Sequence, residues 1–115
     1  MGAVPNSSKL RWQRDAHKAL GGLLKLNDLP VIAWRIPVSG VLVGDVDSLT
    51  STPAEMRAAF VAWAQRLDAV VVPERAAVDG VTHLYAKFRL DVGFGVGGAL
   101  RATIYQPMDD DGGAR

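Results

Sequence analysis

Residues 93–98, Gly-Phe-Gly-Val-Gly-Gly, match the G-x-G-x-x-G pattern of dinucleotide-binding loops. In such loops a strand leads into a tight turn, and the N-terminus of the next helix presents backbone N–H groups to a pyrophosphate. Here residues 99–105 alternate apolar and polar side chains as a strand does, so no helix begins. The acidic residue expected about 20 positions further on would fall beyond Arg115. We therefore expect no cofactor at this motif.

The same glycines fit two alternative positions in a C-terminal hairpin. In the first, the preceding strand continues into a three-residue turn at 97–99. In the second, the strand ends near Val92 and residues 93–97 form a five-residue loop, which places Arg89 directly opposite Arg101. Both alternatives keep the even-numbered apolar residues of the two strands on one face, as strand pairing requires. Either one predicts a flexible hairpin end that another backbone can approach closely.

The two histidines have no evident catalytic partners. His83 lies on the polar side of a predicted strand, where we expect it to face solvent, and His17 lies between the apolar and basic sides of a predicted helix. A general base needs a carboxylate that orients it and a reacting group nearby, and the sequence identifies neither. The serines lie near turns and helix starts, where their hydroxyls act as caps.

The carboxylates do not predict a metal site. Asp45 and Asp47 fit the start of a calcium-binding loop, but Leu49 and Thr50 occupy the positions of the third ligand and the glycine. The run Asp109–Asp111 predicts a solvated acidic tail, or one that folds back on the basic first helix. The chain has no cysteine, which excludes disulfides, thiolate metal sites and cysteine nucleophiles. We therefore expect no metal, no catalytic residues and no enzyme.

Length and composition indicate one domain, residues 1–115, with a core of its own. Hydrophobic residues make up 49% of the chain and charged residues 22%, values typical of a folded protein. We find no signal peptide and no apolar stretch long enough to span a membrane, and a chain without cysteine is expected in the cytoplasm. The net charge is +1, yet residues 1–35 carry six basic groups and two acidic ones.

A first helix is predicted from Ser8, which would be its N-cap. Gly21 and Gly22 weaken its interior by about 1 kcal/mol each, so the helix is expected to kink or end there. The flanking residues 1–7, like 107–115 at the other end, are predicted to be flexible tails. Apolar residues line one side of the helix and basic residues the opposite side: Trp12, Ala16, Ala19, Leu20 and Leu23 against Arg11, Arg14, Lys18 and Lys25.

The middle of the chain predicts a hairpin and a second helix. Two β-branched runs, at 31–36 and 41–46, are joined by a turn-prone connection and indicate a β-hairpin. Thr52 and Glu55 then form a capping box with proline at the first helical position, which predicts a helix over residues 53–68.

The last part of the chain predicts an edge strand and a long hairpin. A short strand at 70–72 is closed by Pro73, and period-two alternation begins at Thr82. The element order α–β–β–α–(β)–β–β predicts an α+β fold, with two helices and a mainly antiparallel sheet of four or five strands in hairpins.

Two surfaces are candidates for binding. The polar side of the C-terminal hairpin interleaves aromatic and cationic side chains, as surfaces for single-stranded nucleic acid do, unless the first helix covers it. The basic side of the first helix could also follow phosphates, or be an ordinary solvated face. The candidate contacts with nucleic acid or another anion are Tyr85, Lys87, Arg89, Arg101 and Tyr105 on the hairpin, and Arg11, Arg14 and Lys18 on the helix.

Four segments, Leu29–Trp34, Leu42–Val46, Arg57–Ala64 and Thr82–Ala86, resemble a group of small actinobacterial proteins that have no assigned activity. Members of that group are often encoded near phage or mobile-element genes. The likeness covers residues 29–105. It implies a cytoplasmic protein of α+β type and brings no catalytic residue to this chain.

Together these observations predict a small non-enzymatic module that binds another protein, as a regulatory or accessory factor. Exposed apolar residues such as Val61 would support self-association, so a homodimer is included in this expectation. The alternative is a nucleic-acid-binding protein, and salt-dependent retention on single-stranded DNA or RNA distinguishes the two.

Overall fold

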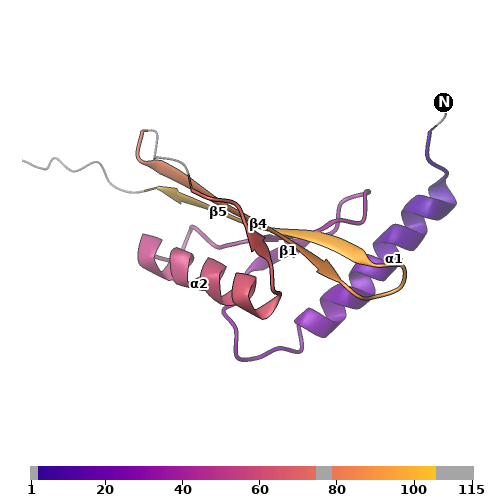
Figure 1. Cartoon of the computed structure of the whole chain (residues 1–115), viewed down its shortest axis with the longest axis horizontal. Coiled ribbons are helices and arrows are strands. Elements are labelled where there is room, and N and C mark those ends of the chain that lie inside the picture. The colour runs from indigo at the N-terminus through magenta and orange to yellow at the C-terminus, as the bar shows by residue number, and fades with distance from the viewer. Residues whose placement is uncertain (1–2, 75–78, 106–115) are drawn as a thin grey trace, which may run out of the picture.

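The α+β fold expected from the sequence is confirmed by a computed structural model, which describes residues 3–74 and 79–105. Two helices and five strands follow one another in the order α-β-β-α-β-β-β (Figure 1). The tail predicted at 107–115, with its three aspartates, lies outside the described residues. The elements are α1 (Asn6–Leu23), β1 (Ala33–Arg35), β2 (Leu42–Asp45), α2 (Pro53–Arg66), β3 (Val70–Val71), β4 (Val81–Leu90) and β5 (Val96–Tyr105).

The five strands form one sheet in the order β1-β2-β5-β4-β3. The pairs β1–β2, β4–β5 and β3–β4 are antiparallel, as the hairpin signals predict, whereas β2 pairs with β5 in parallel. A parallel pair needs a long crossover connection, and here the chain from β2 to β5 passes through α2, β3 and β4. The sheet is therefore mixed, although mostly antiparallel.

Helix α1 begins earlier than predicted and continues through both glycines. Pro5 is its N-cap residue, without a side-chain cap, so Ser8 is not the N-cap. The N–H of Ser8 instead donates to the carbonyl of Pro5 at 3.1 Å, one turn inside the helix. Gly21 and Gly22 are both exposed. The helix persists around them because Ala19 and Leu23 are buried against the core, and this packing outweighs the low helix propensity of glycine.

Helix α2 has the predicted capping box. The N–H of Glu55 donates to the hydroxyl oxygen of Thr52 at 3.1 Å, and the N–H of Thr52 donates to the Glu55 carboxylate at 2.8 Å. The helix ends at Arg66, two residues before the predicted end, and Asp68 follows in a left-handed conformation with φ 52°. Its buried residues, Met56, Ala59, Phe60, Trp63 and Ala64, face the sheet.

A single core lies between the sheet and the two helices. Trp34 of β1 contacts the rings of Trp63 and Phe88 edge-on, at centroid distances of 5.3 and 6.3 Å. The indole N–H of Trp63 donates to the carbonyl of Pro30 at 2.7 Å, which satisfies the polar atom of a buried ring. Figure 1 shows α2 along one side of the β4–β5 ribbon and α1 across the end that carries the hairpin loop.

The hairpin loop has five residues, 91–95, and differs from both predicted alternatives in position. Leu90 pairs with Val96, so the strand ends two residues before the predicted Val92 and the three-residue turn at 97–99 is wrong. Even-numbered residues still pair with even-numbered ones, as expected. Gly93 and Gly95 adopt positive φ, 59° and 103°, inside this loop, a backbone conformation that glycine takes without strain.

Candidate nucleic-acid interface

The odd-numbered residues of β4 and β5 form a sheet face that neither helix covers. His83, Lys87, Arg89, Arg101 and Tyr105 are exposed, whereas the even-numbered residues of β4 from Thr82 to Phe88 are buried. The face continues onto β2 and β1, because residues directly opposite each other in a ladder share a face. We call it the open face; it carries Ala33, Arg35, Val43, Asp45, Val70, Val81, His83, Tyr85, Lys87, Arg89, Gly97, Ala99, Arg101, Thr103 and Tyr105.

The open face concentrates the positive charge of the sheet. The four lysine and arginine residues within the five strands all lie on it, and Asp45 is the single carboxylate within those strands. The four cations are Arg35, Lys87, Arg89 and Arg101. Four positive charges against one negative charge make this face attractive to a polyanion.

Asp45 binds two of these cations at once. Its two carboxylate oxygens lie 3.2 Å from Nε of Arg35 and 3.3 Å from Nε of Arg101. The guanidiniums are about half exposed, so these ion pairs contribute little to stability. Their effect is geometric, because they tie Arg35 of β1 and Arg101 of β5 to β2, and Arg101 is the direct partner of Tyr85 across the ladder.

Three rings lie in successive rows of the β4–β5 ladder. Tyr105 is opposite Val81, His83 is opposite Thr103, and Tyr85 is opposite Arg101. Rows on the same face are two residues apart, or roughly 7 Å. The Nδ1 of His83 lies 3.3 Å from the hydroxyl of Thr103, which restrains the imidazole on the face. Lys87 and Arg89 occupy the two following rows, so the rings lead into a pair of cations.

The predicted site residues thus fall into two groups. Tyr85, Lys87, Arg89, Arg101 and Tyr105 share the open face, as expected. The predicted pairing of Arg89 with Arg101 is wrong: Arg89 faces Gly97 and Arg101 faces Tyr85, because the loop begins two residues earlier. The second group, Arg11, Arg14 and Lys18, is exposed on α1. Sequence reasoning missed Arg35 and Asp45, since only the parallel pairing of β2 with β5 brings them beside Arg101.

Asp47, the second of the carboxylates examined for calcium, belongs to an exposed turn. The hydroxyl of Thr50 donates to its carboxylate, and the backbone N–H of Leu49 donates to the other oxygen at 2.8 Å. These hydrogen bonds, the one from Thr50 first, lower the pKa of Asp47 because they favour its charged form. Within the described residues, no three histidine or acidic side chains lie close enough together to hold a metal ion.

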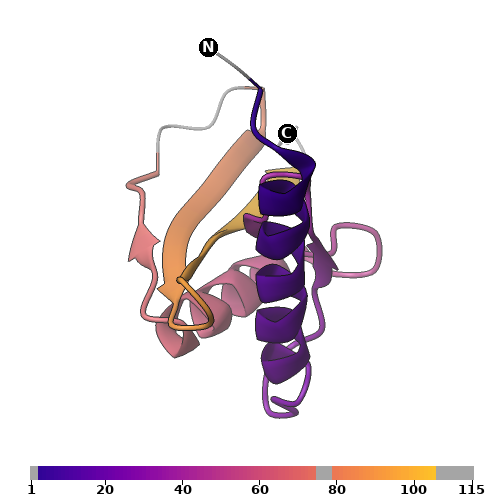
Figure 2. The same cartoon turned by 90° about the vertical axis from the view of Figure 1, so that its right-hand side faces the viewer.

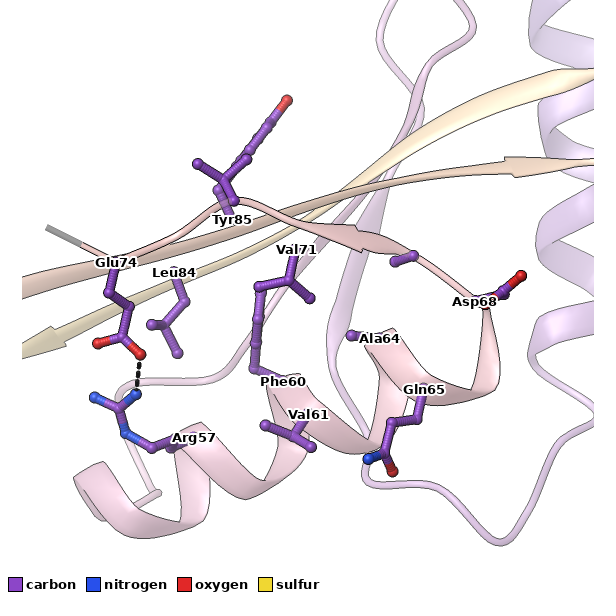
Figure 3. A pocket seen from close by; sticks show the side chains of 12 residues that line it. Arg57, Phe60, Val61, Ala64, Gln65, Asp68, Val71, Glu74, Leu84 and Tyr85 are labelled. Carbon is purple, nitrogen blue, oxygen red and sulfur yellow. Dashed lines mark hydrogen bonds and ion pairs between the residues drawn. The ribbon is translucent and has the colours of Figure 1, made fainter.

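An apolar groove lies between α2 and the segment from β3 to Glu74 (Figure 3). It has a volume of about 450 Å³, and Phe60, Val61, Val71 and Leu84 contribute to its lining. The ion pair between Arg57 and Glu74, 2.5 Å apart, lies beside these apolar residues. Val61 is exposed there, as predicted. The groove itself was not predicted. The feature of the sequence that could have indicated an apolar surface here is the run of three valines at 70–72 on an edge strand.

Comparisons of the chain with protein-family models, curated proteins and solved structures find no match. The resemblance to small actinobacterial proteins therefore stays a prediction, and the function has to be argued from the geometry of the chain itself. Neither helix in the described part of the chain is long and apolar enough to cross a membrane.

Proposed function

We propose that this protein binds single-stranded nucleic acid on the open face. The observation that carries the proposal is that every lysine and arginine within the five strands lies on this one uncovered face, together with both tyrosines. Proteins that bind single strands combine cations that neutralise phosphates with rings on which bases stack. Both components are present here, in adjoining rows of one hairpin.

The spacing of the rings favours a single strand over a duplex. The rows of Tyr105, His83 and Tyr85 are roughly 7 Å apart, about twice the separation of about 3.4 Å between successive nucleotides along one strand of a duplex. Bases that stack on these rings must therefore be unstacked from one another, which a single strand permits. Lys87, Arg89 and Arg101 then lie beside the rings, where they can contact phosphates.

Fluorescence anisotropy with labelled fifteen-nucleotide oligo-dT and oligo-U, and with a duplex of the same length, tests the proposal. We expect the single strands to bind more tightly than the duplex, and log K to fall with log salt with a slope of about −0.7 per phosphate contacted. The triple variant K87A/R89A/R101A should lose this binding.

The matched control removes the same charge elsewhere. Lys9, Arg57 and Arg66 lie off the open face, so K9A/R57A/R66A should retain most of the affinity. If the two triple variants lose the same affinity, the binding depends on the net charge of the protein and not on the open face. Unchanged binding in K87A/R89A/R101A would refute the open face as the site.

Self-association is a second candidate, favoured by the groove beside β3. Val61, Val71 and Val72 are exposed around it, and β3 is an edge strand whose outer backbone groups have no strand partner among the described residues. A two-fold pair would bury the same patch on both copies. Sedimentation equilibrium over a hundredfold concentration range should then show a dimer that V61E/V71K dissociates. A monomer throughout would exclude this candidate and leave nucleic-acid binding untouched.

A further inference from the structure

The glycine-rich loop at 91–95 joins the open face to α1. Both views place the loop beside this helix (Figures 1 and 2), and the ring of Phe94 lies under the guanidinium of Arg11, 5.3 Å from it. A cavity of about 270 Å³ opens at this junction. Arg11 of α1 and Arg89 of the open face both line it, together with residues of the loop and of the turn at Ser39–Gly40.

The loop glycines give Arg89 its place in this cavity. Nη2 of Arg89 reaches the carbonyl oxygen of Phe94 at 3.5 Å, a long hydrogen bond. A Cβ on Gly95 would lie 2.5 Å from Nη2, and Gly95 also has φ +103°. Any other residue would therefore strain the loop and displace the guanidinium. The second half of the G-x-G pattern thus allows an arginine side chain to approach, where the dinucleotide fingerprint would place a phosphate.

The charge in the cavity is positive. Among the described residues neither Arg11 nor Arg89 has a carboxylate within ion-pair distance. Asp15 also lines the cavity, with its carboxylate packed against Gly93, where a Cβ would come within 2.5 Å of it. Two guanidiniums against one carboxylate leave room for one more negative charge, which is what a phosphodiester group supplies.

Beyond the cavity the cations continue along α1. Lys18 lies seven residues after Arg11, two turns further and roughly 10 Å along the helix on nearly the same side. Arg14 borders this row, and both side chains are exposed. Phe94 is 83% exposed between the two groups of cations, so the side of its ring that Arg11 does not cover can stack on another base.

We infer that the cavity between Arg11 and Arg89 binds a phosphate of the nucleic acid, and that the strand continues from the open face past Phe94 onto Arg11 and Lys18. This inference rests on the proposed function and extends it to a second segment of the site. It joins the two candidate surfaces of the sequence, the hairpin and the first helix, into one track.

The length of the bound oligonucleotide tests the inference. A six-nucleotide strand can be held by the open face alone, whereas an eighteen-nucleotide strand can also reach α1. In R11A/K18A we expect the affinity for the eighteen-mer to fall about tenfold and its salt slope to lose about 1.4, from two phosphate contacts. The affinity for the six-mer should not change. The control K9A/R66A removes two charges that lie off the track, one on another side of α1 and one on α2, and should bind both lengths normally.

Each outcome decides one of the two proposals. If R11A/K18A binds the eighteen-mer as the wild type does, or loses affinity equally for both lengths, the track is overturned and the open face stands. If the wild type binds neither length, the proposed function fails and the track fails with it. Circular dichroism of each variant checks that α1 has formed.

Discussion

The two faces of the β4–β5 hairpin come from alternate residues of the same two strands, yet they follow different rules. On the core face, Leu84, Phe88, Leu100 and Ile104 are buried by the helices. On the open face, exposed or half-exposed rings in three successive rows are followed by two exposed cations. The residues of the core face are determined by packing alone, since other apolar side chains of similar size and shape could fill the same space. No packing requirement explains the residues of the open face, so its composition is the more informative about a partner.

The open face is not polar throughout. Val43 and Ala99 lie at its centre and are nevertheless buried. Lys87 lies directly opposite Ala99, and Arg35 directly opposite Val43. Long cationic side chains can cover small apolar neighbours with their alkyl stems while the charged heads stay in water. The apolar residues of this face are therefore buried beneath its cations, and the surface that a partner would meet is cationic and aromatic.

The largest expected effect is a difference in the free energy of unfolding between substitutions at two adjacent residues, one on each face. Leu100 is 0% exposed, so Leu100→Ala should cost about 2–5 kcal/mol in the free energy of unfolding. Arg101→Ala should cost less than about 1 kcal/mol, since its ion pair with Asp45 is exposed. Urea unfolding of both variants measures the difference. Similar losses would mean that the two faces are not distinct.

The adjacent glycines of β5 sharpen the same contrast. A Cβ on Gly98 would clash with the ring of Phe88 on the core face, whereas a Cβ on Gly97 would meet nothing within 4 Å. Gly98→Ala should therefore lower the free energy of unfolding by about 1–3 kcal/mol. Gly97→Ala should leave it unchanged within about 0.5 kcal/mol. Thermal unfolding of the pair measures both, and a tolerated alanine at 98 would contradict the packing described.

Substitution of Asp45 should affect nucleic-acid binding on the open face but hardly affect the stability of the fold. Asp45→Asn should change the free energy of unfolding by less than about 1 kcal/mol. It should tighten binding to oligo-dT, because Arg35 and Arg101 lose their shared carboxylate and become free for phosphates. The salt slope should steepen by up to about 0.7. Weaker binding by D45N would show that orienting Arg101 matters more than freeing it.

The smallest effect lies outside both faces, in the turn after β2. Because its pKa is lowered in the folded protein, Asp47 adds stability above the pKa of its unfolded form, and this contribution is lost as the pH falls through the folded value. Thr50→Val removes the largest cause and should move the NMR titration midpoint of the Asp47 carboxyl back towards the usual value for aspartate. An unchanged midpoint would assign the shift to the backbone N–H of Leu49.

Local signals in the sequence predicted much of the fold. The capping box at Thr52 and the alternation along β4 each depend only on residues that are close together in the sequence. Both faces of the hairpin follow from that alternation. The parallel pairing of β2 with β5 depends on contacts far apart in the chain, so no local pattern indicates it. It is this pairing that adds Arg35 and Asp45 to the candidate site.

The glycine run shows where local reasoning misplaced a boundary. The pairing of even-numbered with even-numbered residues was predicted correctly. The loop nevertheless spans residues 91–95, with Gly93 and Gly95 at positive φ, because the alternation of polarity does not show where the strand pairing ends. Similarly, α1 begins before Ser8 and continues through Gly21 and Gly22 to Leu23, because tertiary packing overrides the low helix propensity of the glycines.

The most direct test is an NMR titration with a short oligo-dT that follows side-chain signals from both faces. Thr103 and Ala102 are adjacent, and their methyl groups lie on the open face and the core face. We predict that the Thr103 methyl and the rings of Tyr85 and Tyr105 shift in a saturable way, while the Ala102 methyl does not. No shift on the open face, or shifts centred on the groove beside α2, would contradict the account.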